Sequence, residues 1–244
     1  MFSFENIIML WQDYWQIFIF EGLKYTLILS AIAVFFGVIF GSFIAFGRMS
    51  DIRPFKIINK YNENNNAILK AVANFNPVSF ICEVYTEVIR GTPLLLQLYF
   101  FVFLIPKVLP FINQFNAVAL ALSFNSAAYV SELFRSGIQA VDKGQTEAAR
   151  SLGMNKTQTM LRVILPQAIK NILPAVGNEF IAIIKETSMA STFFVGDLMT
   201  SYLVVRGATY LALESLIIIG VIYLVVTFTL SKLIGKYERK LNSK

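Results

Sequence analysis

The sequence predicts an all-α integral membrane protein, and three observations support that prediction. Of its 244 residues, 56% are hydrophobic and only 15% are charged, whereas soluble domains carry about 25% charged residues. Long apolar runs recur along the chain, and a transmembrane helix needs roughly 20 apolar residues. Basic residues gather at the ends of these runs. These features predict one membrane unit with five transmembrane helices.

The first 24 residues form the first expected element. They combine Phe, Ile and Leu with Trp11, Trp15 and few charges. Trp favours the membrane–water interface, so residues 1–24 are expected to form an amphipathic interfacial helix on the outer face. The alternative is a frayed, unstructured tail. The transmembrane domain then covers residues 25–244.

The five transmembrane helices follow in order. They are expected at residues 25–47, 81–106, 116–131, 174–190 and 215–231. The first contains Gly37 and Gly41, a spacing suited to close helix contact. The second is uncharged only from residue 91 onward, and residues 81–90 extend it as helix; Pro93 lies near the start of the uncharged part.

The basic residues set the expected orientation. Segments 47–80, 135–170 and 232–244 hold 16 of the 21 Lys and Arg residues, whereas segments 1–24, 107–116 and 191–214 hold three. Cytoplasmic segments carry the excess of Lys and Arg, so the N-terminus is expected outside and the C-terminus inside. The net charge of +6 therefore reflects topology, and no nucleic-acid partner is expected.

Several kinds of chemistry have no residues to support them. The chain has no histidine and one cysteine, so no metal site is expected. It also lacks the GxxxxGK[ST] phosphate loop, so this motif gives it no means to bind ATP. The sequence predicts no bound cofactor and no enzyme activity.

Polar residues within the apolar spans are the candidates for a solute pathway. Glu132, Glu179 and Glu186 lie in or near spans, where a charge costs at least about 2.5 kcal/mol and is usually paired or lines a cavity. Glu186 could bind a cationic solute or neutralise Lys185. Gln97 could line a path or hydrogen-bond a neighbouring helix.

Residues 136–172 form a polar loop between two spans. Residues 145–152 are good helix formers, and Gly153 is suited to end that helix in the left-handed conformation. Apolar spacing predicts a second helix over residues 156–165, which Pro166 breaks or kinks. Two short helices with a Gly turn could dock in a partner's groove or lie on anionic lipid, and the composition favours neither.

This loop resembles the EAA loop of ABC importer permeases. The resemblance rests on Glu147-Ala148-Ala149, on Gly153, and on the sequence VILP from Val163 to Pro166, with nine residues between Gly153 and Val163. The stretches RGTPLLLQLYF, AAYVSELFRSGIQAV and NEFIAIIKETSMAS resemble the polar amino-acid uptake subfamily. The resemblance therefore implies a type I importer fold in the bacterial cytoplasmic (inner) membrane.

The resemblance also implies roles and partners. It assigns coupling to an ATPase to the following residues: Glu147, Ala148, Ala149, Gly153, Leu165 and Pro166. It places a midmembrane substrate pathway at the following: Gln97, Glu186, Thr187, Ser188 and Asp197. The implied partners are cytoplasmic ATPase subunits that hold ATP and Mg²⁺, a second permease chain, an extracytoplasmic solute-binding protein and membrane lipid.

A second function stays open on the sequence alone. An ion-coupled secondary amino-acid transporter or channel would use Glu132, Glu179 and Glu186 as its pathway, although no internal repeat of the kind such carriers often show is visible. The loop from Arg48 to Tyr85 is longer than the subfamily leads us to expect, and neither function explains it.

Overall fold

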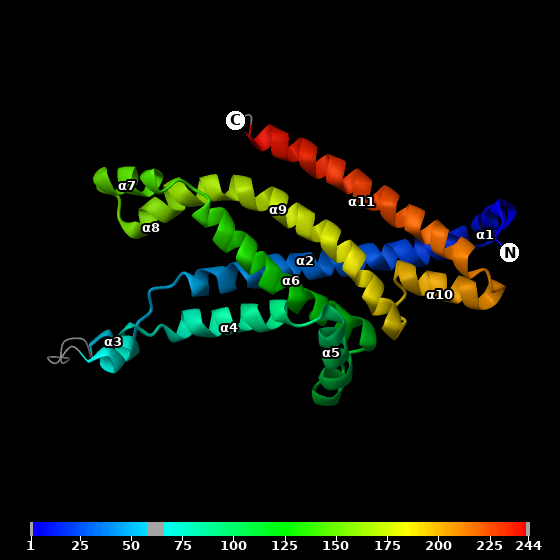
Figure 1. Ribbon diagram of the computed structural model, residues 1–244, viewed down its shortest axis with the longest axis horizontal. Helices are drawn as coiled ribbons and strands as arrows, with labels where there is room; N and C mark the ends of the chain where they lie inside the picture. Colours follow the sequence, from blue (N-terminus) through cyan, green and yellow to red (C-terminus); the bar gives the residue numbers. More distant parts are fainter. Residues whose placement is uncertain (1, 58–65, 243–244) are drawn as a thin grey trace.

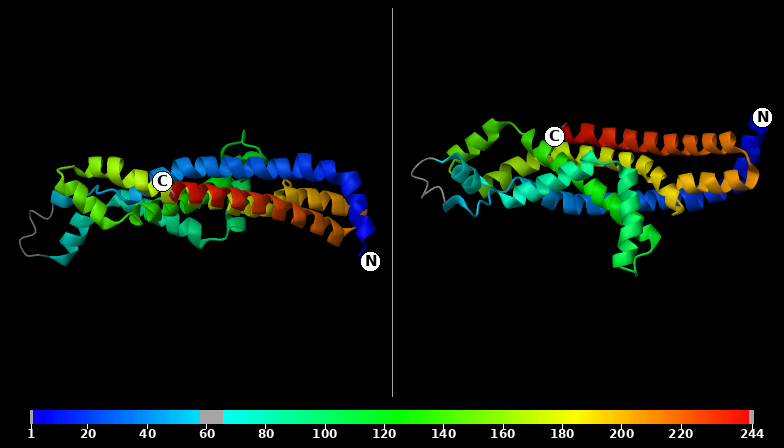
Figure 2. Two further views of the ribbon diagram at one scale, coloured as in Figure 1. Left: turned by 90° about the horizontal axis from the view of Figure 1, so that it is seen from above. Right: turned by 60° about the horizontal axis from the view of Figure 1, so that its bottom comes forward.

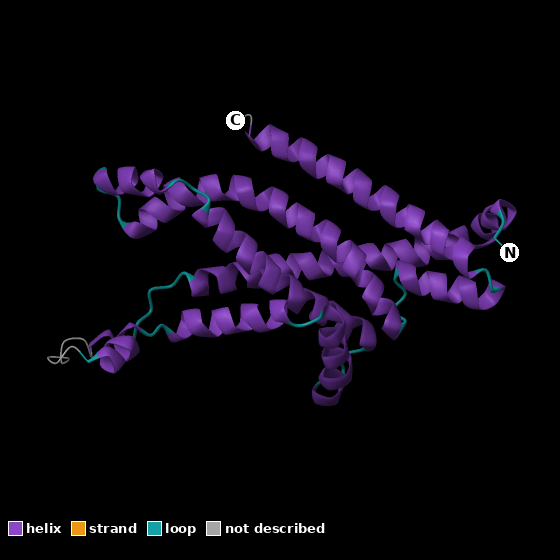
Figure 3. Ribbon diagram, viewed as in Figure 1, coloured by secondary structure: helices purple, strands orange, loops and turns teal. Residues whose placement is uncertain are grey.

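The computed structural model describes residues 2–57 and 66–242, and within these residues every regular element is a helix (Figure 3). The α-helices are α1 (Phe4–Gln16), α2 (Lys24–Arg48), α3 (Ala67–Asn74), α4 (Pro77–Gly91), α5 (Leu94–Val108), α6 (Gln114–Gln139), α7 (Lys143–Ser151), α8 (Lys156–Thr159), α9 (Leu165–Glu186), α10 (Leu198–Thr209) and α11 (Ala212–Asn242). The expected all-α fold class is confirmed.

The long helices give the molecule two ends. Helices α2, α4, α6, α9 and α11 run lengthwise, while α5 crosses them (Figures 1 and 2). The short helices α3, α7 and α8 lie at one end, called here the α7 end. The N-terminus, α1 and α10 lie at the other, called the α1 end. The elements that the sequence assigns to opposite sides of a membrane thus lie at opposite ends of the bundle.

Three helices are long and apolar enough to cross a membrane by length and composition, and two bent pairs raise the number to as many as five. The three are Phe4–Arg48, Gln114–Gln139 and Ala212–Leu241. The pairs are Ala67–Asn74 with Pro77–Gly91, bent by 79°, and Lys156–Phe193 with Leu198–Thr209, bent by 46°. The predicted five is the upper value of this range.

The second expected span is not one helix, which corrects the prediction for residues 81–106. Helix α4 ends at Gly91 and α5 begins at Leu94. Thr92 is extended, with φ −115° and ψ 146°, because a residue before proline avoids the α-helical region. Pro93 therefore separates two helices at the point where the sequence predicted continuity.

A break expected at Pro166 does not occur. Helix α8, a π-helical turn over Met160–Ile164, and α9 form one continuous helix from Lys156 to Glu186. Proline lacks a backbone N–H and its ring crowds the preceding turn. A wide π-helical turn lies directly before Pro166 and relieves that crowding within the helix.

Helices α2 and α6 pack closely against each other. A Cβ added to Gly37 would lie 2.4 Å from the Ser126 hydroxyl oxygen, and one added to Gly41 would lie 2.8 Å from the Ala127 carbonyl oxygen. No larger side chain fits at either position, so the Gly37–Gly41 spacing does mark a close helix contact.

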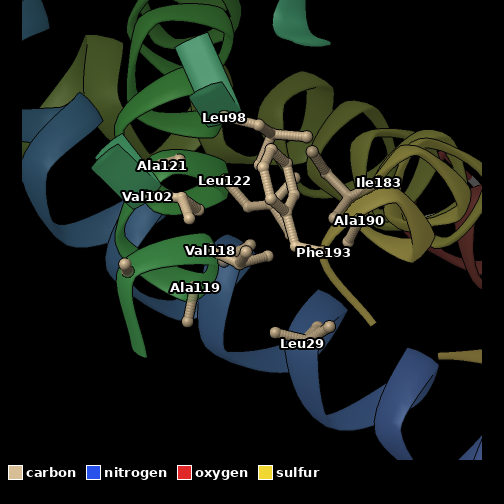
Figure 4. Packing of buried hydrophobic residues seen from close by; sticks show 12 residues of the cluster. Leu29, Leu98, Val102, Val118, Ala119, Ala121, Leu122, Ile183, Ala190 and Phe193 are labelled. Carbon is tan, nitrogen blue, oxygen red and sulfur yellow. The ribbon is translucent and has the colours of Figure 1, made fainter. Parts of the chain in front are cut away.

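Two hydrophobic clusters fix the remaining helices. In the first, Leu29 of α2, Leu122 of α6 and Ile183 of α9 are fully buried with Leu98 of α5 (Figure 4). In the second, α1 and the π-helical turn Ile17–Leu23 bury residues against α10 and α11. The N-terminal segment is therefore a packed helix, which excludes the frayed tail, and α1 turns aside from the line of α2 (Figure 2).

Candidate functional site

The polar loop at the α7 end begins with a well-defined helix and turn. Asp142 caps α7 by accepting a hydrogen bond from the Gly144 backbone N–H at 2.6 Å. Gly153 has φ +84°, the left-handed conformation that glycine adopts without strain. The Gly153 N–H donates to Arg150 O at 3.0 Å and the Met154 N–H to Ala149 O at 3.1 Å. This pair of bonds is a Schellman motif, so the predicted Gly turn is confirmed.

The helix that follows the turn is capped as firmly as α7. The Asn155 side chain accepts from the Gln158 N–H at 2.9 Å, and the Gln158 side chain accepts from the Asn155 N–H at 3.0 Å. This reciprocal capping box satisfies two backbone donors that a helix start leaves without partners. The turn between α7 and α8 is thus closed on both sides by hydrogen bonds.

The loop is attached to the bundle along one side of α7. Ala149 is 4% exposed, and α7 packs on the π-helical turn Met160–Ile164, where Ile164 is buried in a cluster with Ile138 of α6 and Ala168 of α9. Gln167 also donates to the Gln145 side chain at 3.1 Å. These contacts join α7 to α6 and α9. We call residues 142–166 the displayed loop.

The outward side of the displayed loop has exposed polar and apolar groups. Glu147 is exposed and makes no hydrogen bond or ion pair with any described residue. Leu152 is 83% exposed and Leu161 is 58% exposed. Ala148 and Pro166 are exposed as well, while Leu165 is half-buried. The six predicted coupling residues therefore belong to one structural unit, in which Ala149 is buried and Glu147 is exposed.

A hollow of about 520 Å³ lies beside α7. It is lined by Ile138, Gln139, Val141, Lys143, Thr146, Met160 and Ile164. Its apolar floor comes from α6 and the π-helical turn, and Lys143 and Thr146 of α7 form part of its wall. A partner surface that met the displayed loop would find both a projecting helix and a recess next to it.

Polar residues at the α1 end are buried and hydrogen-bond to α10. Asp197 is fully buried and caps α10, accepting from the Met199 N–H at 2.9 Å and from the Thr200 hydroxyl. The Leu198 N–H donates to the Thr26 hydroxyl at 2.9 Å, which ties α10 to α2. We call Thr26, Asp197 and Thr200 the buried cap cluster.

The other predicted pathway residues fall into two groups. Glu186 ends α9, and Thr187 and Ser188 begin a 3₁₀ helix over Thr187–Phe193 that leads toward Asp197. Thr187 is fully buried and donates to Ile184 O at 2.7 Å, while Glu186 and Ser188 are half-buried. These three residues and Asp197 therefore lie along one short segment of the chain, residues 186–197.

Gln97 belongs to a separate group. Its side-chain N–H groups donate to Ile89 O at 2.7 Å and to both oxygens of Thr92, and its carbonyl oxygen accepts from Asn125 at 3.0 Å. Among the described residues, no hydrogen bond joins it to Glu186, Thr187, Ser188 or Asp197. Gln97 therefore links the bend between α4 and α5 to α6. Of the two roles that the sequence left open for Gln97, these bonds correspond to hydrogen bonding with a neighbouring helix.

The Glu132 carboxylate forms ion pairs with two arginines. It accepts from Arg48 Nη1 at 2.8 Å and from Arg135 Nε at 3.0 Å. Both guanidinium groups hold this carboxylate in its charged form through direct hydrogen bonds. A carboxylate fixed in this way is poorly suited to carry ions along a pathway, which weakens the role that the ion-coupled alternative assigns to it.

Ser126 is a buried polar residue that sequence reasoning missed. It lies on α6, where α2 approaches most closely, and its hydroxyl is fully buried with no hydrogen-bond partner among the described residues. Glu179 of α9 lies near it and within electrostatic reach of Glu186. No local pattern distinguishes Ser126 from the other small residues of α6. Only packing shows that it faces a carboxylate.

Comparison with known proteins agrees with this arrangement. Residues 67–243 match the family model of the binding-protein-dependent transport system inner membrane component. The arginine transport system permease protein ArtQ of Bacillus subtilis (strain 168) is 41% identical over 227 residues, 93% of each chain. The putative glutamine transport system permease protein GlnP of Rickettsia bellii (strain RML369-C) is 38% identical and covers 92% of this chain and 93% of that one.

Solved structures share the fold. A crystal structure described as an amino acid ABC transporter with histidines superposes with a TM-score of 0.82 at 41% identity, covering 98% of this chain and 99% of that one. A chain of the inward-facing MetNI methionine ABC transporter gives 0.64 at 16% identity, covering the same shares. The second likeness shows the fold alone.

The helical bundle with a rigid loop displayed at one end defines a subunit of a membrane transport system. The chain belongs to the family of binding-protein-dependent transport system inner membrane components. It is a permease component of an ABC importer in the bacterial inner membrane, not an enzyme, and ATP hydrolysis in such transporters occurs in separate subunits. The family assignment favours this function over the ion-coupled alternative.

Proposed function

We propose that this chain pairs with a second permease chain and carries polar amino acids into the cytoplasm. An extracytoplasmic solute-binding protein would deliver the solute, and cytoplasmic ATPase subunits would bind ATP and Mg²⁺. The names of the relatives support the substrate class, since they are described as arginine, glutamine and L-cystine transport permeases. The distribution of Lys and Arg supports an external N-terminus, with the α7 end in the cytoplasm.

The displayed loop is the observation that carries this proposal. Its two capped helices and its Gly153 turn form a hydrogen-bonded unit, and Glu147 projects from it with no partner among the described residues. We infer that Glu147 contacts the ATPase directly and that Gly153 and Ala149 hold its helix in place. The exposed Leu152 and Leu161 supply the apolar contact that a partner groove would bury.

Movement of the loop would reach the solute path through α9. The displayed loop continues without interruption into α9, which ends at Glu186, where the predicted pathway residues begin. Closure of the ATPase pair would therefore shift α9 as a rigid body and alternate access to the two sides of the membrane. The chain's residues bind and orient the solute, and they break no bond.

The pathway carboxylates favour a solute with positive charge. Glu179 and Glu186 are seven residues apart on α9, so they lie on nearly the same helix face about two turns apart. Asp197 already accepts hydrogen bonds from α10, whereas Glu179 faces only the Ser126 hydroxyl and the more distant Glu186 among the groups that act on its carboxylate. We infer that Glu179 and Glu186 meet the cationic group of an amino acid, with Thr187 and Ser188 beside them.

Uptake by the purified complex tests this function. The complex would be reconstituted in vesicles with its binding protein and supplied with ATP and labelled arginine, histidine, glutamine or cystine. We expect ATP-dependent accumulation of at least one amino acid, and a reduced preference for cationic solutes in Glu179→Gln. Accumulation of sugars or peptides with no amino acid uptake would contradict the substrate class. Uptake driven by an ion gradient without ATP would contradict the mechanism.

A further inference from the structure

The segment between α2 and α4 takes no part in the function above. Its described residues are 49–57 and 66–76, and they include α3 (Ala67–Asn74). We propose that these described residues, 49–57 and 66–76, form a membrane-surface element that binds the anionic headgroups of the cytoplasmic leaflet, with the apolar face of α3 in the lipid. The side of the membrane rests on the orientation proposed above.

Helix α3 is amphipathic, and its apolar face is unpacked. Ile68, Leu69 and Val72 share one side at 100° per residue, while Lys70 and Asn74 lie on the other. Ile68 is 73% exposed and Val72 is 42% exposed. Only Ala73 of this helix is buried, and it lies to one side of the apolar face. The helix therefore touches the protein along its flank and leaves its apolar face uncovered.

A second apolar group lies before α3. Ile52, Phe55 and Ile57 are exposed beside Arg53 and Lys56. An exposed set of large apolar residues interleaved with basic ones is the composition of segments that insert into an anionic membrane surface.

The charge of the described segment fits an anionic surface. It has three basic residues, Arg53, Lys56 and Lys70, and a single acidic residue, Asp51. The Asp51 carboxylate is already engaged by Lys156 at the start of α8 and lies 3.8 Å from Arg53. Basic residues near an anionic leaflet are attracted to its headgroups, so the charge favours lipid headgroups.

The position and direction of α3 also fit a membrane surface. Hydrogen bonds from Asn76 to Ser50 O at 2.6 Å and from Ser79 to Arg48 O at 2.8 Å join the two stems of the segment. These stems are the ends of α2 and α4, both lengthwise helices. Helix α3 bends from α4 by 79°, so it lies across the bundle at the α7 end (Figure 1). This is the direction in which an amphipathic helix lies on a bilayer.

Site-specific quenching by lipid tests the proposal. In a Cys82→Ala background of the full-length chain, a single cysteine would be introduced by Val72→Cys on the apolar side or by Asn74→Cys on the polar side. Each would carry an environment-sensitive fluorophore. The chain, without its ATPase, would be placed in vesicles of phosphatidylcholine, or of phosphatidylcholine and phosphatidylglycerol in equal parts, both containing spin-labelled lipid. Ile68→Cys would serve as a second apolar probe.

The expected result is a difference between the two faces that depends on anionic lipid. We expect quenching at position 72 to exceed that at position 74 by about twofold in the mixed vesicles and to fall in phosphatidylcholine alone or after Lys70→Glu. Equal quenching at both positions would overturn the proposal. So would shielding of position 72 that appears only when the ATPase is added or when the protein-to-lipid ratio rises. The assay needs no transport, so its outcome is independent of amino acid uptake.

Discussion

The displayed loop at the α7 end and the buried cap cluster at the α1 end each use an aspartate to cap a helix, but in different surroundings. Asp142 caps α7 in solvent, and the polar residues that follow it point outward, with Glu147 unpaired among the described residues. Asp197 caps α10 with no exposure, and its neighbours Thr26 and Thr200 are bonded within the bundle. The same local motif therefore belongs to the proposed docking surface in one place and to internal packing in the other.

The largest expected effect is on transport, and it comes from the exposed residue. Glu147→Lys should abolish ATP-dependent uptake, because it reverses the charge at the proposed ATPase contact. It should leave the thermal unfolding of the isolated chain unchanged, because no described residue depends on that carboxylate. Uptake assays check the expected loss of transport, and thermal unfolding checks the expected unchanged stability. Glu238→Lys, an exposed charge reversal on α11, is the matched control and should retain uptake. Normal uptake by the Glu147 variant would end the coupling proposal.

The largest effect on folding should come from the buried cap. Asp197→Ala removes the acceptor of the Met199 N–H where water cannot replace it, so it should lower the free energy of unfolding by about 2 kcal/mol, whereas Asp142→Ala at the exposed cap should cost about 0.5 kcal/mol. Denaturant titration in mixed micelles measures both. Asp197→Asn keeps a capping oxygen and should restore most of the stability. Equal losses of unfolding free energy in Asp197→Ala and Asp142→Ala would show that burial of a cap does not increase its contribution to stability.

A smaller loss of stability should follow from the turn of the displayed loop. Gly153→Ala places a Cβ at φ +84°, which costs about 1 kcal/mol. Gly207 lies inside α10 with open space around it, so Gly207→Ala should be neutral or stabilising by up to about 1 kcal/mol. The same titration compares them. If both alanines had the same effect, the turn would not require glycine.

The smallest expected effect concerns the ion pair between Asp51 and Lys156. The hydrogen bond and the charge of Lys156 lower the pKa of the Asp51 carboxyl below its ordinary value. Because the folded-state pKa is depressed, the pair stabilises the protein above the unfolded pKa of about 4, and that contribution is lost as the pH falls through the lower folded value. Asp51→Asn should therefore lower the unfolding midpoint slightly at pH 7 and low salt. High salt should erase the difference, since both side chains are exposed. A difference that persisted at high salt would require another cause.

The sequence predicted the displayed loop better than it predicted the transmembrane helices. Gly153 marks a turn by local chemistry alone, and the polarity of residues 136–172 marks a loop. The break at Thr92 and Pro93 was missed because hydropathy is continuous across it. At Pro166 the sequence predicted a break or kink, but the helix continues, because a π-helical turn accommodates a proline that local rules treat as a helix end.

The buried residues needed the three-dimensional structure. Asp197 precedes α10 as an N-cap does, so its capping role has a local signal. Its burial has none, because it depends on the packing of α10 against α2, where the Leu198 N–H bonds to Thr26, 172 residues away. Ser126 and the helix-bonding role of Gln97 have no comparable signal. Such roles depend on which helices pack against each other. The periodicity of residues within one helix gives no information about its neighbours.

The close contact of Gly37 and Gly41 with α6 has a mechanical consequence. With Ser126 and the Ala127 carbonyl oxygen filling the space where side chains would stand, α2 has no compressible layer between itself and α6. The two helices are therefore expected to move together. If the proposed motion of the displayed loop and α9 also shifts α6, α2 would shift with it, and so would Thr26 and the N–H of Leu198 that bonds to it.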